Sequence, residues 1–117
     1  MQVQAITKNV RMSAQKMREV VRQIQGMPAA RAEAVLKVVP RKGARLVAKT
    51  LKSAIANAED LKVHKKEYNG MRTDRLVIKE AVAQTAATIR RFTPKARGSA
   101  GPILKRSCHI KIVLSDE

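Results

Sequence analysis

Residues 81–115 contain no acidic side chain, although they carry seven Lys and Arg residues. The middle of this stretch, residues 90–102, is rich in Gly, Pro and cations and poor in apolar residues. Such a segment cannot pack into a core, and its Gly and Pro residues disfavour a continuous regular strand. Because its positive charge has no local counterpart, we expect it to leave the globular part of the molecule and meet an anionic partner.

Strand-like sequences flank the basic segment. One strand is predicted to begin at residues 76–78, and the other covers residues 103–114, where apolar and polar side chains alternate and Arg106 interrupts the apolar side. The apolar side of this second strand consists of Leu104, Cys108, Ile110, Ile112 and Leu114. The two strands predict an antiparallel hairpin arm over residues 82–106. An isolated hairpin is marginally stable in water, so we expect its partner to order it.

Three helices are predicted in residues 13–58. The first begins after an N-capping Ser13 and ends before Gly26, the second runs from about Ala29 to Pro40, and the third ends near residue 58. Their inward residues, spaced as on one helical face, are Ala14, Met17, Val21 and Ile24, then Ala32, Val35, Leu36 and Val39, then Ala44, Val47, Ala48, Leu51, Ile55 and Ala58.

Residues 2–10 are also compatible with a strand. These elements predict an α+β fold: a small globular domain of three helices packed on a short antiparallel sheet, with a long β-hairpin extension. A chain of 117 residues forms one domain, residues 1–117, with a modest core. Tyr68 and Phe92 are its only aromatic residues, so aliphatic side chains and Ala must fill that core, which leaves too little for a deep substrate cavity.

The charge of the whole chain points to nucleic acid. Twenty-five Lys and Arg residues against nine Asp and Glu give a net charge of +16. Residues 1–58 hold 12 cations and two acids, whereas residues 59–80 are nearly balanced, which predicts two basic contact surfaces and one segment facing water. A row of cations lies beside the apolar stripe of the third helix and can track a phosphate backbone: Lys42, Arg45, Lys49 and Lys52. The alternative is a solvated helix face, which the absence of acids in this helix before Glu59 disfavours.

Catalytic and metal-binding patterns are absent from the sequence. His64 lies among Lys residues, and Cys108 and His109 are neighbours that would point to opposite faces of a strand. We therefore expect no enzyme, no cofactor and no metal. Cys108 is interpreted as a small core residue and His109 as a neutral polar contact to RNA or backbone. A lone cysteine and the lack of a signal peptide or membrane-spanning run predict a soluble, cytoplasmic protein that does not enter a membrane.

With two aromatic residues, the chain cannot offer a sheet of stacked bases, so RNA must be held by charge and shape. Phe92 could contact a base or sugar, or it could pack inside the hairpin. A helix-turn-helix DNA-binding protein is an alternative, because three short helices with basic faces occupy residues 13–58. A cationic membrane-surface protein is another, although this chain places Ala where such proteins place large apolar residues.

Four stretches together resemble one family: residues 10–13 with Lys16 and Arg18, residues 53–58, residues 94–98 and residues 104–110. The chain is similar to the bacterial form of the universal large-ribosomal-subunit protein number twenty-two. The resemblance implies an α+β domain on the outer face of the large subunit and a hairpin that threads into ribosomal RNA to line the nascent-peptide exit tunnel. It also implies contacts with several rRNA domains, with neighbouring ribosomal proteins and with the nascent polypeptide in transit, and a role in subunit assembly.

Charge and resemblance together predict two sets of site residues. RNA-binding residues are Lys8, Arg11, Lys16, Arg18, Arg22, Arg41, Lys42, Arg45, Lys49, Lys52, Arg90, Arg91, Lys95, Arg97, Lys105, Arg106 and His109. The tunnel-lining tip consists of Arg90, Arg91, Phe92, Thr93, Pro94, Lys95, Ala96, Arg97, Gly98, Ser99, Ala100 and Gly101.

The chain departs from the family pattern at three places. Ser13-Ala14-Gln15-Lys16 replaces the usual Ser-Pro-Arg-Lys, the segment over residues 59–75 is longer than usual, and Thr85-Ala86-Ala87 replaces the Glu-Gly-Pro that precedes the hairpin tip. The last departure concerns the bend expected at the start of the tip.

Overall fold

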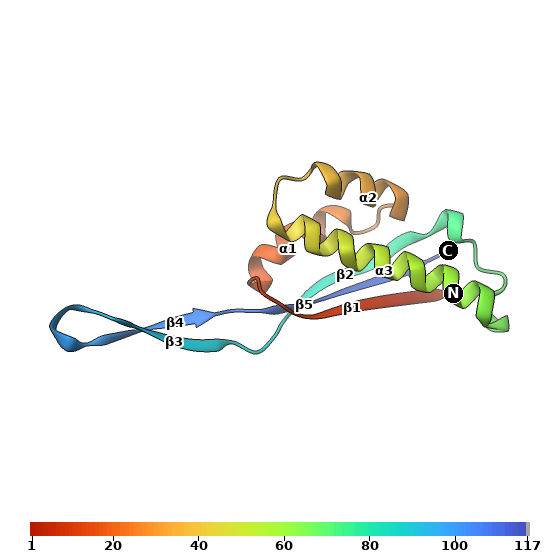
Figure 1. Cartoon of the computed structure of the whole chain (residues 1–117). Coiled ribbons are helices and arrows are strands. Elements are labelled where there is room, and N and C mark those ends of the chain that lie inside the picture. The colour runs from red at the N-terminus through yellow and green to blue at the C-terminus, as the bar shows by residue number, and fades with distance from the viewer. Residues whose placement is uncertain (117) are drawn as a thin grey trace.

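A computed structural model describes residues 1–116 of the chain. The elements follow the order β1 (Gln2–Val10), α1 (Ala14–Ile24), α2 (Ala29–Val38), α3 (Lys42–His64), β2 (Val77–Thr85), β3 (Ile89–Pro94), β4 (Ala100–Lys105) and β5 (Cys108–Ser115), with short 3-10 turns at Lys66–Tyr68, Thr73–Arg75 and Ala96–Gly98. The three helices lie together on one side of a small antiparallel sheet, from which a two-stranded arm projects (Figure 1). The α+β prediction is confirmed.

The main sheet has the order β1-β5-β2, with both pairs antiparallel. Because β5 is paired on both edges and covered by helices on one face, it is the most buried strand. Its residues Ile110, Ile112 and Leu114 have no exposed surface, which confirms the predicted apolar side of this strand. Within residues 1–116, no helix covers the opposite face of the sheet, which presents mostly polar side chains.

The first helix begins and ends where the sequence predicts. The Ser13 hydroxyl accepts a hydrogen bond from the backbone N–H of Lys16 at 3.4 Å, which satisfies one of the unpaired donors of the first turn. After Ile24 the chain turns at Gly26, whose φ of +82° suits glycine, and the Gly26 N–H donates to the Ile78 carbonyl at 2.9 Å. This bond ties the end of α1 to the start of β2.

The third helix is longer than predicted. It continues to His64 instead of ending near residue 58, because residues 59–64 favour helix although the apolar stripe fades there. Leu61 still packs against the core, whereas Val63 is 75% exposed. Helix α2 packs on α3 and completes the helical layer.

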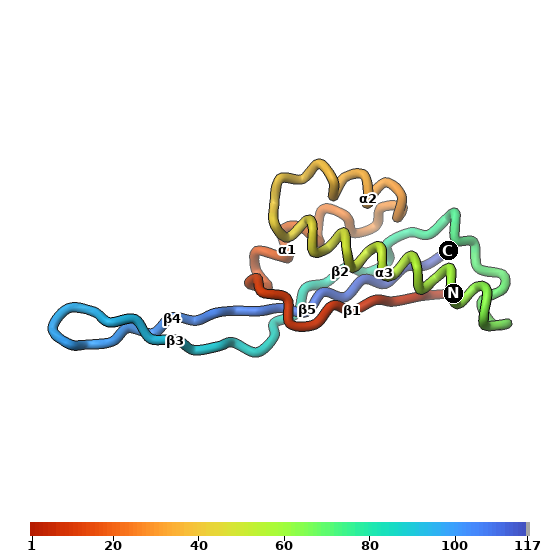
Figure 2. Tube along the Cα trace, in the orientation of Figure 1, coloured from red at the N-terminus to blue at the C-terminus, as the bar shows by residue number. Residues whose placement is uncertain are grey.

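The arm consists of β3 paired with β4, from Ile89 opposite Lys105 to Pro94 opposite Ala100. The prediction that this stretch cannot form regular strand was wrong, because the two strands satisfy each other's backbone groups and leave their cations in solvent. Only residues 95–99 form the turn, where Arg97 (φ +61°) and Gly98 (φ +71°) are left-handed. The arm accounts for the elongated shape, 67 × 28 × 16 Å (Figure 2).

Leu104 does not lie on a buried apolar side, contrary to the prediction. Its side chain is 46% exposed, because it belongs to the arm, beyond the edge of the helical layer. No residue between Ala83 and Cys108 belongs to the hydrophobic core, so within residues 1–116 the arm contributes no side chain to this core.

A joint separates the main sheet from the arm. The β2–β5 pairing ends with Thr85 opposite Cys108, so residues 82–85 pair within the main sheet. Residues 86–88 then face the two residues 106–107, and this unequal count interrupts both ladders. The Ala86 N–H donates to the Ser107 carbonyl at 3.1 Å, and the Ser107 hydroxyl donates to the Ala87 carbonyl at 2.6 Å. Where the family pattern led us to expect a bend, the structure thus has an interrupted ladder held by one backbone and one side-chain hydrogen bond.

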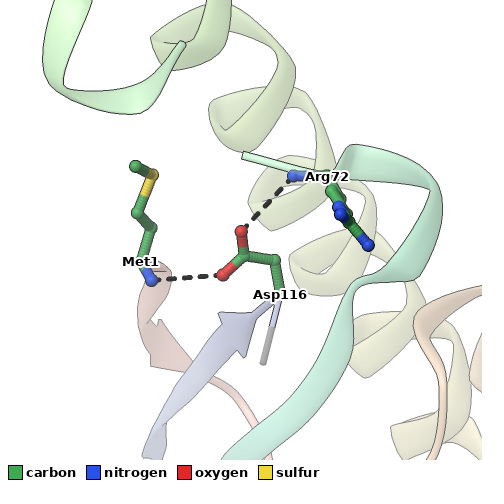
Figure 3. Close-up of polar contacts among 3 residues, drawn as sticks. All are labelled: Met1, Arg72 and Asp116. Atoms are coloured by element: carbon green, nitrogen blue, oxygen red, sulfur yellow. Dashed lines mark hydrogen bonds and ion pairs between the residues drawn. The ribbon is translucent and has the colours of Figure 1, made fainter. Parts of the chain in front are cut away.

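The part of the charge-balanced segment (residues 59–80) that connects α3 to β2 lies at the far end of the domain from the arm. Most of its side chains are exposed, and Met71, which is 1% exposed, anchors it to the core. Asp116, directly after β5, joins this segment to the start of β1 (Figure 3): its carboxylate accepts from the N-terminal ammonium of Met1 at 3.1 Å and from the backbone N–H of Arg72 at 3.4 Å.

Candidate nucleic-acid interface

The predicted RNA-binding residues are exposed, with the exception of the half-buried His109. Within residues 1–116, Arg41 is the one member of the set that forms an ion pair, with Glu19 on α1. Exposed ion pairs contribute little to stability. The other cations therefore present their charge to solvent without local neutralisation, as expected of a surface that binds a polyanion.

The cationic row of the third helix lines a surface hollow between α2 and α3, which we call the helical hollow. Its volume is about 920 Å³. It is lined by Glu33, Leu36, Lys37, Val38, Val39, Pro40, Arg41, Lys42, Arg45, Ala48, Lys49 and Lys52. Six of these residues are cations and one is an acid, so the hollow can follow a phosphate backbone.

A second hollow lies where the arm leaves the domain, and we call it the arm-root hollow. Its volume is about 970 Å³. It is lined by Arg11, Met12, Ser13, Gln15, Lys16, Lys42, Ile89, Arg91, Leu104, Lys105, Arg106 and Ser107. Six cations surround it and no acid does, and two of its aliphatic residues, Ile89 and Leu104, are about half exposed.

Lys42 lines both hollows. It stands at the first residue of α3, between the end of α2 and the start of α1. The two hollows therefore adjoin, and the cations form one track from α3 past the root of the arm. The sequence did not reveal this continuity, because it depends on packing between elements that are distant along the chain.

The arm has two different faces. Residues opposite each other in an antiparallel pair share a face, so Arg90, Phe92 and Leu104 lie on one face and Ile89, Arg91 and Lys105 on the other. Phe92 is 74% exposed, so it does not pack inside the hairpin. Lys95 and Arg97 lie at the turn, where both are exposed.

Four predicted residues lie outside the two hollows and the arm. Arg18 on α1 donates from Nε to the Ala83 carbonyl at 3.1 Å, so part of its guanidinium supports β2. His109 contacts backbone, because its Nδ1 accepts from the N–H of Asn9 at 3.1 Å. Lys8 lies in the part of β1 where the register against β5 shifts, between Thr7 and Val10, and Arg22 lies on α1.

Lys37 is a cation that the sequence interpretation missed. It lies in the last turn of α2 and faces the helical hollow. Its position became significant only because α2 packs on α3, which no local pattern in the sequence indicates.

Cys108 belongs to the core, as predicted, and has no exposed surface. Burial raises the pKa of its thiol, and the nearby charge of Arg18 opposes that rise only in part. No group of three His, Cys, Asp or Glu residues in the described part of the chain is arranged to hold a metal. None of the helices in residues 1–116 is long and apolar enough to cross a membrane.

The geometry thus combines a small α+β domain, an acid-poor cationic track and a protruding two-stranded arm. Residues 5–115 match the family model described as ribosomal protein L22p/L17e. The chain belongs to the ribosomal protein L22p/L17e family. The family resemblance expected from the sequence is therefore confirmed, and with it the expectation that the protein is not an enzyme.

Curated members of the L22p/L17e family align over nearly the whole chain. The protein from Opitutus terrae, named large ribosomal subunit protein uL22, is 48% identical over 116 residues, which cover 99% of this chain and 96% of the relative. Proteins of the same name from Akkermansia muciniphila and Chloroflexus aggregans are each 44% identical over 117 residues, covering all of this chain and 98% and 97% of the relatives.

Membership in the L22p/L17e family decides against the helix-turn-helix alternative. The structure gives a physical reason as well, because α3 buries one side against the sheet and offers Lys and Arg beside it. A recognition helix that reads base edges offers Asn, Gln, Arg or Ser to them, whereas α3 offers mainly Lys, Arg and Ala, which favours contact with the phosphate backbone.

Proposed function

We propose that this chain is a structural component of the large ribosomal subunit that binds ribosomal RNA through its cationic track. In this proposal it aids subunit assembly and lines the nascent-peptide exit tunnel with the tip of its arm. Its partners are rRNA from several domains, neighbouring large-subunit proteins and the nascent chain, in the cytoplasmic ribosome. The observation that carries the proposal is the track of cations from α3 to the arm, in which Arg41 is the one residue with an ion pair among residues 1–116.

The electrostatics of the track support RNA as the partner. Eleven different cations line the two hollows, against one acid, Glu33. Such a surface gains affinity by releasing counterions from phosphates, and it repels other cationic proteins. Exposed Phe92 and the scarcity of aromatic residues support binding by charge and shape to one large folded RNA rather than to short sequence motifs.

The shape of the arm supports a role at a distance from the domain. It contributes nothing to the described core, so its length and its acid-free sequence are unexplained by folding alone. A narrow two-stranded ribbon that satisfies its own backbone groups can pass between RNA helices where a globular domain cannot. The exposed turn, residues 95–99, is then the part that reaches the tunnel wall.

Binding of the purified chain to protein-free bacterial rRNA tests the first part. We expect tighter binding to large-subunit rRNA than to small-subunit rRNA, with an affinity that falls steeply with salt concentration. Equal affinity for the two RNAs at every salt concentration would contradict the proposal.

Site-specific photo-crosslinking in assembled ribosomes tests the second part. A photoreactive residue replaces Ala96 at the turn, and a matched variant carries it at Ala34, an exposed position on α2. We expect radiolabelled nascent chains to crosslink to position 96 and not to position 34. If ribosomes that have incorporated either variant show no crosslink to nascent chains, the tip does not reach the tunnel.

A further inference from the structure

The arm-root hollow differs from the helical hollow in a way that bears on what it binds. The helical hollow contains an acid, Glu33, and four of its six cations stand in a row along α3. Within residues 1–116, no acid lines the arm-root hollow, and its cations come from several directions: the β1–α1 connection, the first turn of α1, the start of α3, and the arm with its root. Cations that surround one space can contact a single ligand from several sides, whereas cations in a row can contact successive phosphates along a surface.

Aliphatic surface lies among these converging cations. Ile89 is 48% exposed and Leu104 is 46% exposed, and both line the hollow together with half-buried Met12. Burying the exposed aliphatic surface is favourable only if the ligand offers an apolar face. The outside of an RNA duplex offers phosphates and sugars, whereas an unstacked nucleotide offers the face of its base together with its phosphates.

We infer that the arm-root hollow receives an unstacked nucleotide of single-stranded rRNA, whose phosphates contact the surrounding cations and whose base packs against Ile89, on the face of the arm that also carries Arg91 and Lys105. The hollow, at about 970 Å³, has the size of sites that enclose small organic ligands. Its position adds a second role: a nucleotide held there contacts both the domain and the arm, and so fixes the direction of the arm. This inference rests on the proposed RNA binding and specifies one of its contacts.

Two classes of variant test the inference in binding to protein-free bacterial large-subunit rRNA. Ile89→Ala removes apolar contact, and we expect it to weaken binding about fivefold with an unchanged dependence on salt. Arg106→Gln and Lys16→Gln remove charge, and we expect each to reduce the slope of log affinity against log salt by about 0.7. The matched controls are Val63→Ala, an exposed aliphatic residue, and Lys66→Gln, both in or beside the charge-balanced segment, and we expect no effect of either beyond twofold.

Directed cleavage identifies the form of the RNA in the hollow. Iron tethered to a Gln15→Cys variant generates hydroxyl radicals at the lining of the hollow, and a Gln23→Cys variant on the same helix, outside the hollow, is the control. Native Cys108 can remain, because it is fully buried. We expect cleavage from position 15 in unpaired rRNA nucleotides.

The outcomes separate this inference from the proposed function. If wild-type protein does not prefer large-subunit rRNA, the proposed function fails. If it does, but Ile89→Ala, Arg106→Gln and Lys16→Gln bind like their controls, only the inference fails, and the occupant is then an acidic neighbour or solvent. Cleavage confined to duplex RNA also overturns the inference, whatever the binding constants show.

Discussion

His109 and Asn9, which are 100 residues apart in sequence, are joined by a hydrogen bond of 3.1 Å from the Asn9 N–H to the His109 Nδ1. Asn9 has a left-handed φ of +56°, at the place where the register of β1 shifts against β5. The shift leaves the Asn9 N–H outside the strand ladder, and the imidazole supplies its acceptor. His109 therefore stabilises an irregular strand end next to the basic β1–α1 connection.

Replacing His109 with Ala should reduce the free energy of unfolding by about 1 kcal/mol, the net contribution of one hydrogen bond. Chemical denaturation measures the change. His64→Ala is the control, because the side chain of His64 is 70% exposed and pairs only with Asp60 one helical turn away. An equal loss in both variants would show that the Asn9 contact contributes nothing specific.

Replacing Asp116 with Asn should destabilise the protein at neutral pH and leave it unaffected in strong acid. The N-terminal ammonium, by its hydrogen bond, holds the pKa of the Asp116 carboxyl below its ordinary value of 3.8. A carboxyl with a lowered folded-state pKa stabilises the fold at pH above the ordinary value, and that contribution is lost as the pH falls through the folded-state pKa. Thermal unfolding measures the melting temperatures of the wild type and the Asp116→Asn variant between pH 2 and 7, with Asp74→Asn as the control. The two curves of melting temperature against pH should converge only at the acidic end. Parallel curves would mean that the contact does not form in solution.

Replacing Lys42, Arg45, Lys49 and Lys52 together with Gln should weaken rRNA binding and flatten its salt dependence. The expected change in slope is up to about 0.7–0.9 log units for each phosphate that these cations no longer neutralise. The control replaces four cations of the charge-balanced segment, Lys62, Lys65, Lys66 and Arg72, which changes the net charge by the same amount. If both quadruple variants show the same reduction in slope, the helical hollow is not a specific RNA-binding surface.

Replacing the turn residues 95–99 with the two-residue turn Asn-Gly should leave the globular domain folded. The arm provides no core side chain, so the melting temperature should change by less than about 4 °C, the shift expected for roughly 1 kcal/mol in a domain of this size. Circular dichroism and a melting curve check this outcome. Loss of helical signal in the shortened protein would show that the arm takes part in the folding of the domain.

Cys108 should react with a thiol reagent only when the domain unfolds. The thiol has no exposed surface, and burial raises its pKa, so little reactive thiolate is present. We expect modification at least about 100-fold slower than in the unfolded chain, because core strands open with free energies of several kcal/mol. A Cys108→Ala, Ser99→Cys variant, with its thiol at the exposed turn, should react at the rate of the unfolded chain.

Local patterns predicted most elements of this fold. The N-cap at Ser13, the turn at Gly26 and the alternation through Ile110 and Ile112 each depend on neighbours within a few residues. The errors arose where distant contacts decide. Residues 90–102 are unpromising as an isolated strand, but pairing with a second strand makes them regular. Leu104 has the right period for a core residue, but it lies beyond the edge of the helical layer.

The candidate site was predictable as a set of cations and not as a shape. Composition predicted which side chains would meet a polyanion, because their charge has no partner in the sequence. The two hollows, the contribution of Lys37 and the shared position of Lys42 result from how α2, α3 and the arm root are placed against one another. No spacing in the sequence encodes that placement.

A small change of angle at the joint, residues 86–88 and 106–107, produces a large displacement of the arm tip. Six strand residues and half of the turn extend the arm by roughly 25–30 Å, at about 3.3 Å a residue. Over that length a tilt of about 10° at the joint displaces the tip by about 5 Å, slightly more than the spacing of neighbouring strands in a sheet. Two hydrogen bonds through Ser107 set the angle in the free protein, so small adjustments at the root are read out as large movements at the tip. A ligand in the arm-root hollow therefore determines the direction in which the arm points.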